Sequence, residues 1–594
     1  QLVGSTARSP LFGVEVPVVS HRLADPEQGT GVAMVCTFGD TTDVVWWREL
    51  GLTTRGVVGR DGRFVADTPA WLTGERARSA YAALAGKRVD QARRAMVEML
   101  AASGEMEPDP RPITHPVKFY EKGESPLEIV TSRQWYLRNG GRDPGLRAEL
   151  RARGGELSWV PDFMKVRYEH WVDGLAGDWL VSRQRFFGVP FPVWYPVDEE
   201  GRPDHGRPIL PDEADLPVDP ASQAPPGYGE PQRGVPGGFV ADPDVMDTWA
   251  TSSLSPQIVT GWEEDPDLFA RTFPMDLRPQ AHEIIRTWLF SSVVRAHLEQ
   301  GELPWRLATI SGWVVDPERR KMSKSKGNVV TPMDIVDRHG ADGVRYWAAR
   351  GRPGVDTTFD EGQMRVGRRL AIKLLNASRF VLGLGDPDEV EPADGVVSEP
   401  VDRAMLTRLA ATVQACTAAL DAFDYTRALD RAEGEFWWWA DNYVELVKGR
   451  AYESGDADEA VRGAQSARRA LGLALSTFLR LFAPFLPFVT EEVWSWWRQG
   501  SIHRAPWPSA ESPAEDGDPL VLERLADVLA AVRRTKTEAK VSMRAPVDRL
   551  VVAVAAGQMT GLGAGLSDLA RASNVARVEV VEEAIPRIEV VLAP

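Results

Sequence analysis

Apolar residues recur every three or four positions in three segments of the second half of the chain, which is the spacing of one face of an α-helix. These segments carry Leu370, Leu374, Ala377 and Val381, then Leu406, Leu409, Val413, Cys416 and Leu420, and finally Leu522, Leu525, Leu529 and Val532. An acidic stretch rich in Pro and Gly, residues 383–400, separates the first segment from the second. The pattern predicts an all-helical domain that begins near Met364.

Strand-like patterns lie towards both ends of the chain. Residues 550–554 and 578–581 follow the last helical segment, and they predict a small α+β piece at the C-terminus. Near the N-terminus, a β-rich run at 32–37 and a helical stretch at 89–101 predict a compact α+β module. Residues 197–238 are rich in Pro, Gly and acidic residues, and we expect an irregular surface insertion there.

Length and composition narrow the class of protein. A chain of 594 residues is too long for one core and predicts three or four domains. No apolar run approaches the length of a membrane span, which favours a cytoplasmic protein. Two cysteines, Cys36 and Cys416, and eight scattered histidines predict neither a disulfide framework nor structural zinc. Cys416 continues an apolar helical series, so we expect it in the core.

The net charge of −16 argues against indiscriminate binding of nucleic acid, because phosphate contacts need local positive charge. A nucleic-acid partner would then rely on basic clusters, such as residues 319–326 or the group Arg533, Arg534, Lys536 and Lys540. Taken alone, the second cluster is more typical of a solvated helix end than of an RNA contact.

The densest chemistry lies in KMSKSKGN, residues 321–328, which follows Arg319 and Arg320. Five cations within eight positions would repel one another on one helix face, so a loop that closes on a polyphosphate explains them better. An apolar, strand-like run that ends in a polar turn, residues 311–320, precedes the loop, and Thr331 and Pro332 supply the start of a helix through Arg338. The alternative is a solvated basic surface run.

Three further segments offer polar groups beside apolar runs. Asp247, in DVMDTWATSSLSPQ, is suited to hold an ammonium or a polar network, and Trp249 to wall an apolar pocket or to join the core. His282 and Glu283 precede an apolar helical run and have the groups that bind ribose hydroxyls or an adenine edge, although a lone histidine is often structural. The aromatic residues 436–439 and Tyr443 are suited either to stacking on bases or to packing.

These segments together resemble the class I aminoacyl-tRNA synthetases of the branched-chain subgroup, and most closely its valyl members, through nearly the whole chain. KMSKS is their signature loop, RPQAHEIIRTWLF (278–290) is similar to the element that contacts ATP ribose, and SRQRFFGVPFPVWY (182–195) and LFAPFLPFVTEEVW (481–494) are similar to other subgroup segments. The more widespread form has glycine at Ala281 and aspartate at Glu283. Isoleucine differs from valine by one methylene, so an isoleucyl member is an alternative.

The resemblance implies roles for particular residues. Lys321 and Lys324 would be catalytic and stabilise the departing phosphates, and the ATP site would comprise Lys321, Met322, Ser323, Lys324, Ser325, His282 and Glu283. Asp247 and Trp249 would form the amino-acid pocket. Residues 29–43 resemble an editing segment in which Thr30, Asp40 and Asp43 handle a mischarged tRNA end; without the resemblance, the two acids would suit a turn or a helix cap.

The implied fold is α/β: the second half of a Rossmann-type nucleotide-binding domain, part of an inserted β-rich editing domain, an all-helical anticodon-binding domain and a small α+β piece. We place these domains at 116–355, 1–115, 356–515 and 516–594. Implied substrates and partners are valine, ATP with Mg²⁺ and tRNA(Val), with hydrolysis of mischarged threonyl-tRNA, no membrane and a monomeric state.

The family's second signature, His-x-Gly-His, does not occur in the sequence, nor does its Thr-rich editing segment. We therefore expect a chain truncated at the N-terminus that does not form valyl-adenylate alone, because half of the ATP site is absent. A non-catalytic tRNA-binding remnant is a further alternative, although it would have no physical need for the cation cluster of the loop.

Overall fold

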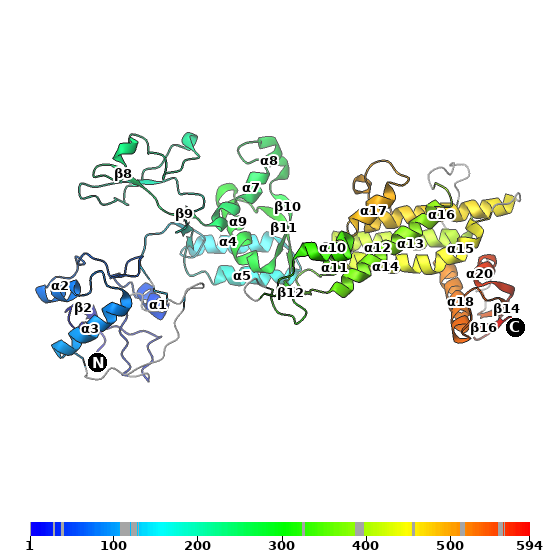
Figure 1. Cartoon of the computed structure of the whole chain (residues 1–594), viewed down its shortest axis with the longest axis horizontal. Coiled ribbons are helices and arrows are strands. Elements are labelled where there is room, and N and C mark those ends of the chain that lie inside the picture. The colour runs from blue at the N-terminus through cyan, green and yellow to red at the C-terminus, as the bar shows by residue number, and fades with distance from the viewer. Residues whose placement is uncertain are drawn as a thin grey trace. The chain divides into compact units, whose positions relative to one another are not determined.

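The computed structural model describes residues 2–27, 30–36, 41–106, 119, 127–128, 130–322, 327–386, 397–453, 458–510, 517–555, 562–563 and 565–594. The chain divides into two compact units: Gln1–Tyr136 with Leu180–Ser182, and Leu137–Trp179 with Arg183–Pro594. Figure 1 labels their helices and strands along the chain. Among the described residues, no helix is both long and apolar enough to cross a membrane.

The first unit is built around short helices. It contains the antiparallel pair β1 (Thr6–Arg8) and β2 (Glu15–Pro17), and the helices α1 (Thr41–Glu49), α2 (Glu75–Ala82) and α3 (Val89–Ser103). Leu72, Ala77 and Tyr81 form its core, and the Tyr81 hydroxyl donates to the Val65 carbonyl at 2.9 Å. The helix predicted over 89–101 is confirmed as α3.

The strand predicted at 32–37 is wrong over the described residues 32–36, which have no regular secondary structure. Val32 and Met34 expose 62% and 74% of their surface. A β-branched run becomes a strand only where a neighbouring ladder and a packed face stabilise it, and here the side chains point into solvent instead.

A three-stranded parallel sheet begins the second unit. Its strands lie in the order β10 (Met275–Ala281), β11 (Trp305–Ser311) and β4 (Ser158–Val160). The helices α4 (Pro144–Glu156), α5 (Lys165–Asp173) and α9 (Phe290–Gln300) belong to the same region, and their apolar faces join a core that includes Tyr168, Phe290 and Ile310. Parallel strands separated by a helix are the arrangement expected of a nucleotide-binding sheet.

The irregular insertion predicted at 197–238 is confirmed. Within it the structure forms only the short turns η2 (Glu213–Asp215) and η3 (Glu230–Gln232) and isolated bridges, and it is flanked by the antiparallel pair β7 (Trp194–Pro196) and β8 (Phe239–Ala241). The chain then forms β9 (Val245–Met246) and the short helices α6 (Thr248–Ser252), α7 (Ser255–Val259) and α8 (Pro266–Thr272) before it enters β10.

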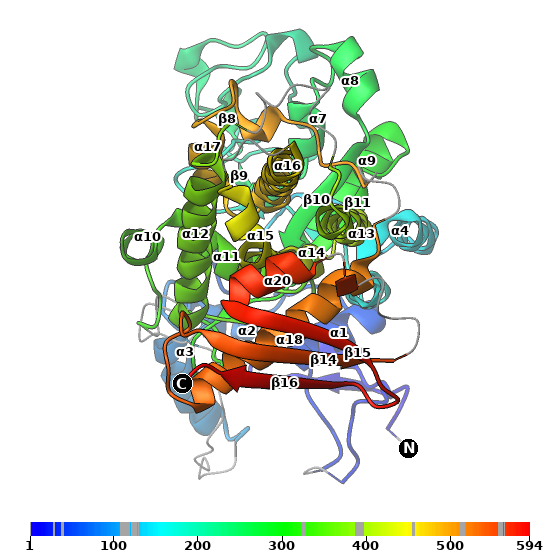
Figure 2. The same ribbon diagram turned by 90° about the vertical axis from the view of Figure 1, so that its right-hand side faces the viewer.

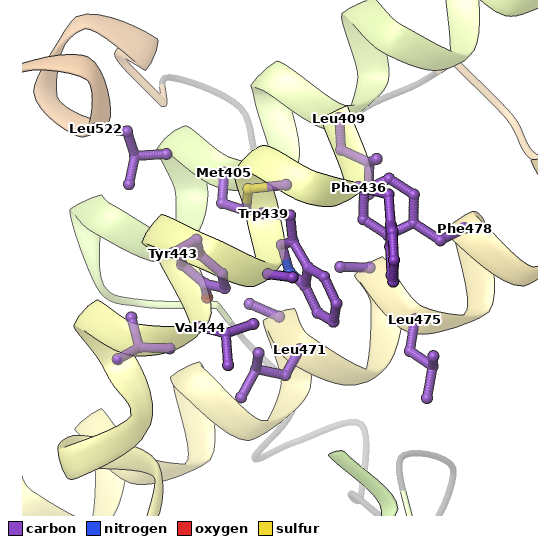
Figure 3. Close-up of a cluster of buried hydrophobic side chains, with 14 of the residues drawn as sticks. Met405, Leu409, Phe436, Trp439, Tyr443, Val444, Leu471, Leu475, Phe478 and Leu522 are labelled. Atoms are coloured by element: carbon purple, nitrogen blue, oxygen red, sulfur yellow. The ribbon is translucent and has the colours of Figure 1, made fainter. Parts of the chain in front are cut away.

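Helices predominate from residue 332 to residue 494, so the helical region predicted from Met364 is confirmed and begins earlier in the chain than predicted. The helices are α10 (Pro332–His339), α11 (Ala341–Ala349), α12 (Glu361–Leu382), α13 (Pro400–Asp421), α14 (Tyr425–Trp438), α15 (Val444–Ala451), α16 (Asp458–Phe482) and α17 (Pro487–Trp494), with a π-helical turn, η7 (Trp439–Tyr443), between α14 and α15. The predicted apolar series line one continuous core, which includes Cys416. Figure 3 shows Phe436, Trp439 and Phe478 packed together at its centre.

The C-terminal piece combines α18 (Pro519–Glu538) and α20 (Leu566–Ser573) with a sheet in the order β15 (Val575–Glu582), β14 (Val547–Val554) and β16 (Arg587–Leu592). Figure 2 shows both helices beside this sheet. The predicted strands at 550–554 and 578–581 are confirmed within β14 and β15. Leu522, Leu525, Leu529 and Val532 bury one face of α18.

A buried charge network joins this piece to the helical bundle. The guanidinium of Arg450 on α15 lies between Asp402 on α13 and Asp568 on α20, and it donates to both oxygens of each carboxylate at 2.8–3.1 Å. Asp402 also accepts from the Tyr443 hydroxyl at 2.8 Å and from Ser466 at 2.6 Å. Their side chains expose 8% (Arg450), 0% (Asp402) and 4% (Asp568) of their surface.

Candidate active site

The candidate site begins where β11 ends. Gly312 follows Ser311, and a Cβ on Gly312 would lie 2.3 Å from the carbonyl of Val355, so only glycine allows this close approach of the two segments. Beyond it, β12 (Val314–Val315) pairs in parallel with β13 (Thr357–Thr358). The prediction for 311–320, a strand-like run that ends in a polar turn, is confirmed: β12 has two residues, and the chain then turns at Asp316 to Arg320.

Asp316 holds the base of the KMSKSKGN loop. Its carboxylate is 3% exposed and accepts hydrogen bonds from the Arg320 backbone at 2.7 Å, the Arg320 side chain at 2.9 Å and the Asn328 amide at 3.0 Å. Burial acts to raise the pKa of Asp316, but the hydrogen bonds outweigh it and lower the pKa. Because Asn328 ends the loop and Arg320 precedes it, Asp316 ties the two ends of the loop together.

The loop leads into a helix as predicted, although the cap differs. α10 starts with Pro332 after Thr331, which has extended backbone torsions. The Thr331 hydroxyl donates to the Asp334 carboxylate at 2.6 Å and makes no capping hydrogen bond with the helix backbone. Ser323, Lys324 and Ser325, which we predicted in the ATP site, lie outside the described residues. Met322 is described and is partly exposed.

Lys321 at the start of the loop meets the residues that follow β10. Its ammonium donates to the Glu283 carboxylate at 2.8 Å, and Glu283 lies on the 3₁₀ turn η4 (His282–Ile284) directly after the strand. The neighbouring His282 lies with Nδ1 3.2 Å from the Ser311 carbonyl at the end of β11. The structure thus brings together Lys321, His282 and Glu283 at the carboxyl ends of adjacent parallel strands, where ligands of α/β sheets bind.

Trp313 completes this group, and the sequence analysis did not identify it. The indole N–H donates to Glu283 Oε2 at 2.9 Å, the Lys321 ammonium lies 4.4 Å from the ring centroid, and the His282 ring centroid lies 4.7 Å away. The hydrogen bond from Lys321, followed by that from Trp313, holds the pKa of Glu283 below its ordinary value. Glu283 is therefore an ionised acceptor at neutral pH.

Asp247 and Trp249 begin helix α6, at some remove in sequence from the loop. Asp247 is 5% exposed; it caps the helix by accepting from the Trp249 amide at 3.3 Å and pairs with Arg183 at 2.8 Å. Of the two predicted uses of Asp247, the structure shows the polar network. Trp249 is 37% exposed, so it is not an ordinary core residue.

A hydrogen bond connects α6 to the element that follows η4. The indole of Trp288, in the π-helical turn η5 (Ile285–Leu289), donates to the Ser252 carbonyl at the end of α6 at 2.8 Å. On its other side, the guanidinium carbon of Arg278 on β10 lies 3.3 Å from the centroid of the Trp288 ring. The segment that bears Trp249 is in this way held beside the segment that bears Glu283.

The predicted editing residues lie in the first unit. Asp43 is in the first turn of α1 and is 8% exposed, whereas Thr30 is exposed and its hydroxyl accepts a long hydrogen bond, 3.4 Å, from the Val32 amide. Asp40 lies outside the described residues. The place of Asp43 in the first turn of α1 fits the alternative of an acid at a helix start, whereas its burial differs from a solvated turn.

Only some of the aromatic residues that we considered for base stacking have exposed surface in the structure. Phe436, Trp439 and Tyr443 are fully buried (Figure 3), so packing accounts for them. Trp437 and Trp438 are partly exposed, and cations lie over their rings: Lys373 at 5.6 Å and Arg408 at 4.1 Å.

The basic cluster predicted at 533–540 is not a solvated helix end throughout. Lys536 is 2% exposed, and its ammonium donates to the carbonyls of Met543 at 3.0 Å and Ser573 at 2.8 Å. Burial lowers the pKa of Lys536. This lysine therefore joins α18 to the turn before β14 and to the end of α20.

Comparison with known proteins completes the description of the site. The family "tRNA synthetases class I (I, L, M and V)" matches residues 40–360, and "Anticodon-binding domain of tRNA ligase" matches residues 402–552. The curated "Valine--tRNA ligase" of Thermobifida fusca is 61% identical over 100% of this chain and 67% of its own length, and that of Salinispora tropica is 57% identical over 98% and 70%. The chain spans about two thirds of the length of these relatives.

Solved structures are more distant. The methionyl-tRNA synthetase of Mycobacterium tuberculosis bound by methionyl-adenylate is 20% identical, covers 67% of this chain and 70% of its own, and has a TM-score of 0.45. The ternary complex of Agrobacterium radiobacter K84 LeuRS with tRNA and LeuAMS is 19% identical, covers 70% and 51%, and also has a TM-score of 0.45.

Proposed function

The chain belongs to the valine–tRNA ligases within the class I tRNA synthetases, and from this premise we propose that, as part of a polypeptide of its relatives' length, it activates valine with ATP and charges tRNA(Val). The observation that carries the proposal is the arrangement of Lys321 and Glu283 at the ends of β10 and β11, in a chain 61% identical to a valine–tRNA ligase. A cation on a loop and an ionised acceptor on the sheet are complementary to the phosphates and the ribose of one nucleotide.

In the first step, a carboxylate oxygen of valine attacks the α-phosphorus of ATP. The bond from that phosphorus to the bridging oxygen breaks, so valyl-adenylate forms and pyrophosphate leaves. The departing pyrophosphate gains negative charge, which Lys321 and Lys324 stabilise together with the Mg²⁺ that accompanies ATP. In the second step, a ribose hydroxyl at the tRNA 3′ end attacks the valyl carbonyl and AMP leaves.

Binding of the nucleoside falls to His282 and Glu283. Because Lys321 and Trp313 both donate to Oε2 of Glu283, its Oε1 is the oxygen suited to accept a ribose hydroxyl. Glutamate stands where the more widespread family form has aspartate, and the anchoring by Trp313 offsets the greater freedom of its longer side chain.

The amino-acid pocket involves α6. Asp247 acts through its cap and its pairing with Arg183, which fix the start of the helix, and the exposed face of Trp249 supplies an apolar wall. A pocket of this kind distinguishes valine from threonine poorly, because the two are nearly isosteric. We therefore assign hydrolysis of threonyl-tRNA to the first unit, with Asp43 holding the α-ammonium and Thr30 and Asp40 as the other residues of this assignment.

The helical module and the C-terminal piece, at 356–515 and 516–594, are proposed to bind tRNA, in line with the anticodon-binding family match at 402–552. Trp437 and Trp438 are the members of the aromatic group that have exposed surface for base stacking.

Valine-dependent exchange of pyrophosphate into ATP tests the proposal. It is measured with a polypeptide that contains this chain and the remaining third of its relatives' length, with isoleucine and threonine in parallel. We expect exchange with valine at least tenfold faster than with isoleucine, because one methylene contributes about 1–3 kcal/mol of discrimination. Preference for isoleucine, or no exchange with any of the three, would overturn the proposal.

The editing assignment has its own experiment. D43A should leave valine exchange within about twofold of the unsubstituted protein and should allow threonyl-tRNA(Val) to accumulate, because the second hydrolytic site is lost. Loss of valine exchange in D43A, or no accumulation of threonyl-tRNA(Val), would contradict the assignment of Asp43.

A further inference from the structure

Trp313 contacts three of the residues that we assign to the ATP site. Its N–H binds the carboxylate of Glu283, its ring face bears the ammonium of Lys321, and the ring of His282 lies against it at 4.7 Å between centroids. His282 and Glu283 come from η4, and Lys321 comes from the KMSKSKGN loop. Glu283 and Lys321 are 38 positions apart in the sequence. The indole links the two elements.

The backbone of Trp313 is held on both sides. Its amide donates to the Asp356 carboxylate at 2.8 Å, and its carbonyl accepts from the Thr357 amide at 2.8 Å. The preceding Gly312 lies too close to Val355 for any side chain. The indole therefore projects from a fixed segment, whereas the Lys321 side chain is half exposed on a long aliphatic stem.

The Lys321 ammonium cannot neutralise a departing pyrophosphate while it remains on Glu283. Moving it leaves Glu283 with the indole N–H as a donor to the same oxygen, so the carboxylate keeps its orientation after the lysine has left. The face of the Trp313 ring attracts the Lys321 ammonium but takes up none of its N–H donors in a strong hydrogen bond, so the contact is readily reversible.

We propose that Trp313 is a positioning residue: it seats Lys321 against Glu283 until a polyphosphate draws the lysine away, and it then keeps Glu283 oriented towards the ribose. This inference rests on the proposed function for the identity of the ligand. The position of Lys321 itself depends only on the contacts among the side chains of Trp313, Lys321 and Glu283.

Lysine labelling tests the seating in the chain as it is. Reductive methylation with formaldehyde and cyanoborohydride, quantified by mass spectrometry, gives a labelling rate for each lysine. W313L removes the ring face and the N–H together, and we expect Lys321 to label about three- to tenfold faster. W313F keeps a ring face, so Lys321 should label within about twofold of the unsubstituted chain.

Lys373 supplies a matched control, because its ammonium also pairs with a carboxylate, Asp441 at 3.1 Å, and lies over an indole, Trp437 at 5.6 Å. Its labelling rate should be unchanged in W313L, which would show that the helical bundle around Lys373 is intact. Conversely, W437L should raise the labelling rate of Lys373 and leave the labelling rate of Lys321 unchanged. Equal labelling of Lys321 in W313L and the unsubstituted chain, with Lys373 also unchanged, overturns the seating.

The orientation of Glu283 is measured in the longer polypeptide by pyrophosphate exchange. Both W313L and W313F lose the indole N–H, so we expect the KM for ATP to rise about three- to tenfold while kcat stays within about twofold. An unchanged KM in W313F overturns the second half of the inference. Absence of exchange in the unsubstituted protein overturns the proposed function instead, and the labelling rates decide separately whether Trp313 seats Lys321.

Discussion

Removing the guanidinium of Arg450 should destabilise the C-terminal half of the chain strongly. Arg450 makes bidentate contacts with both Asp402 and Asp568, and it also donates to the Gly463 carbonyl at 2.7 Å. In R450M, Asp402 would retain Tyr443 and Ser466 as donors, but Asp568 would lose the charge that compensates its burial. An uncompensated buried carboxylate costs several kcal/mol.

The magnitude follows from the burial of all three groups. Breaking a buried ion pair from one side costs about 3–5 kcal/mol, and for a cooperative unit of roughly 200 residues this corresponds to a fall in transition temperature of about 10 °C. Scanning calorimetry measures the transition, and hydrogen exchange should show faster exchange in α20, which the network holds against α13 and α15.

A surface arginine provides the matched control. Arg587 also lies between two carboxylates, Glu583 at 2.9 Å and Glu589 at 2.8 Å, but about half of its side chain is exposed. R587M should shift the transition by less than about 2 °C, because water and salt screen exposed pairs. The triple variant D402N/R450M/D568N, which removes the charges together, should recover part of the loss. A shift in R450M no larger than that in R587M would refute this account of the network.

Three predictions concern the loop and its partners. K321A should lower the kcat of valine-dependent pyrophosphate exchange in the longer polypeptide about 10²-fold with little change in the KM for valine, since Lys321 acts on charge that develops in the transition state; an unchanged kcat would contradict its catalytic role. D316A should release both ends of the loop, so hydrogen exchange at Asn328 should accelerate while exchange in α10 stays the same. Equal exchange at Asn328 in D316A and in the unsubstituted chain would contradict the role of Asp316 in holding the loop. K321M should raise the pKa of Glu283, which Lys321 and Trp313 hold below its ordinary value, and ¹³C NMR of the carboxyl measures it, with E283Q identifying the resonance. The pKa of Glu283 is lower in the folded than in the unfolded protein, so the contact between Glu283 and Lys321 stabilises the folded state at pH values above the unfolded pKa. This stabilisation is lost as the pH falls through the folded pKa, so Lys321 should leave Glu283 only at acidic pH.

The long helices were predictable because burial repeats along one face. Leu370, Leu374 and Val381 lie in the core of α12 as their spacing requires, and the same holds for the apolar series of α13 and α18. The β-rich composition of residues 32–37 was not sufficient to predict a strand there, because a strand depends on a partner strand that its own sequence does not specify.

The candidate site was predictable in part for a related reason. The basic loop is a local signal, and it led to Lys321, while His282 and Glu283 came from their polar groups beside an apolar run and from the family resemblance. Trp313 and Asp316 act through contacts that exist only after β11, β12 and η4 come together, and the sequence shows them as an aromatic residue and an acid in an ordinary turn. Lys536 was grouped with solvated cations because sequence alone does not show that two carbonyls enclose its ammonium.

The most direct test of the central claim is the charging of tRNA(Val) with radiolabelled valine by a polypeptide that contains this chain and the remaining third of its relatives' length. Our account predicts valine-dependent charging that K321A reduces about 10²-fold, with tRNA binding retained. Binding of tRNA(Val) without any charging by the unsubstituted protein would contradict it and would indicate a tRNA-binding protein that lacks catalysis.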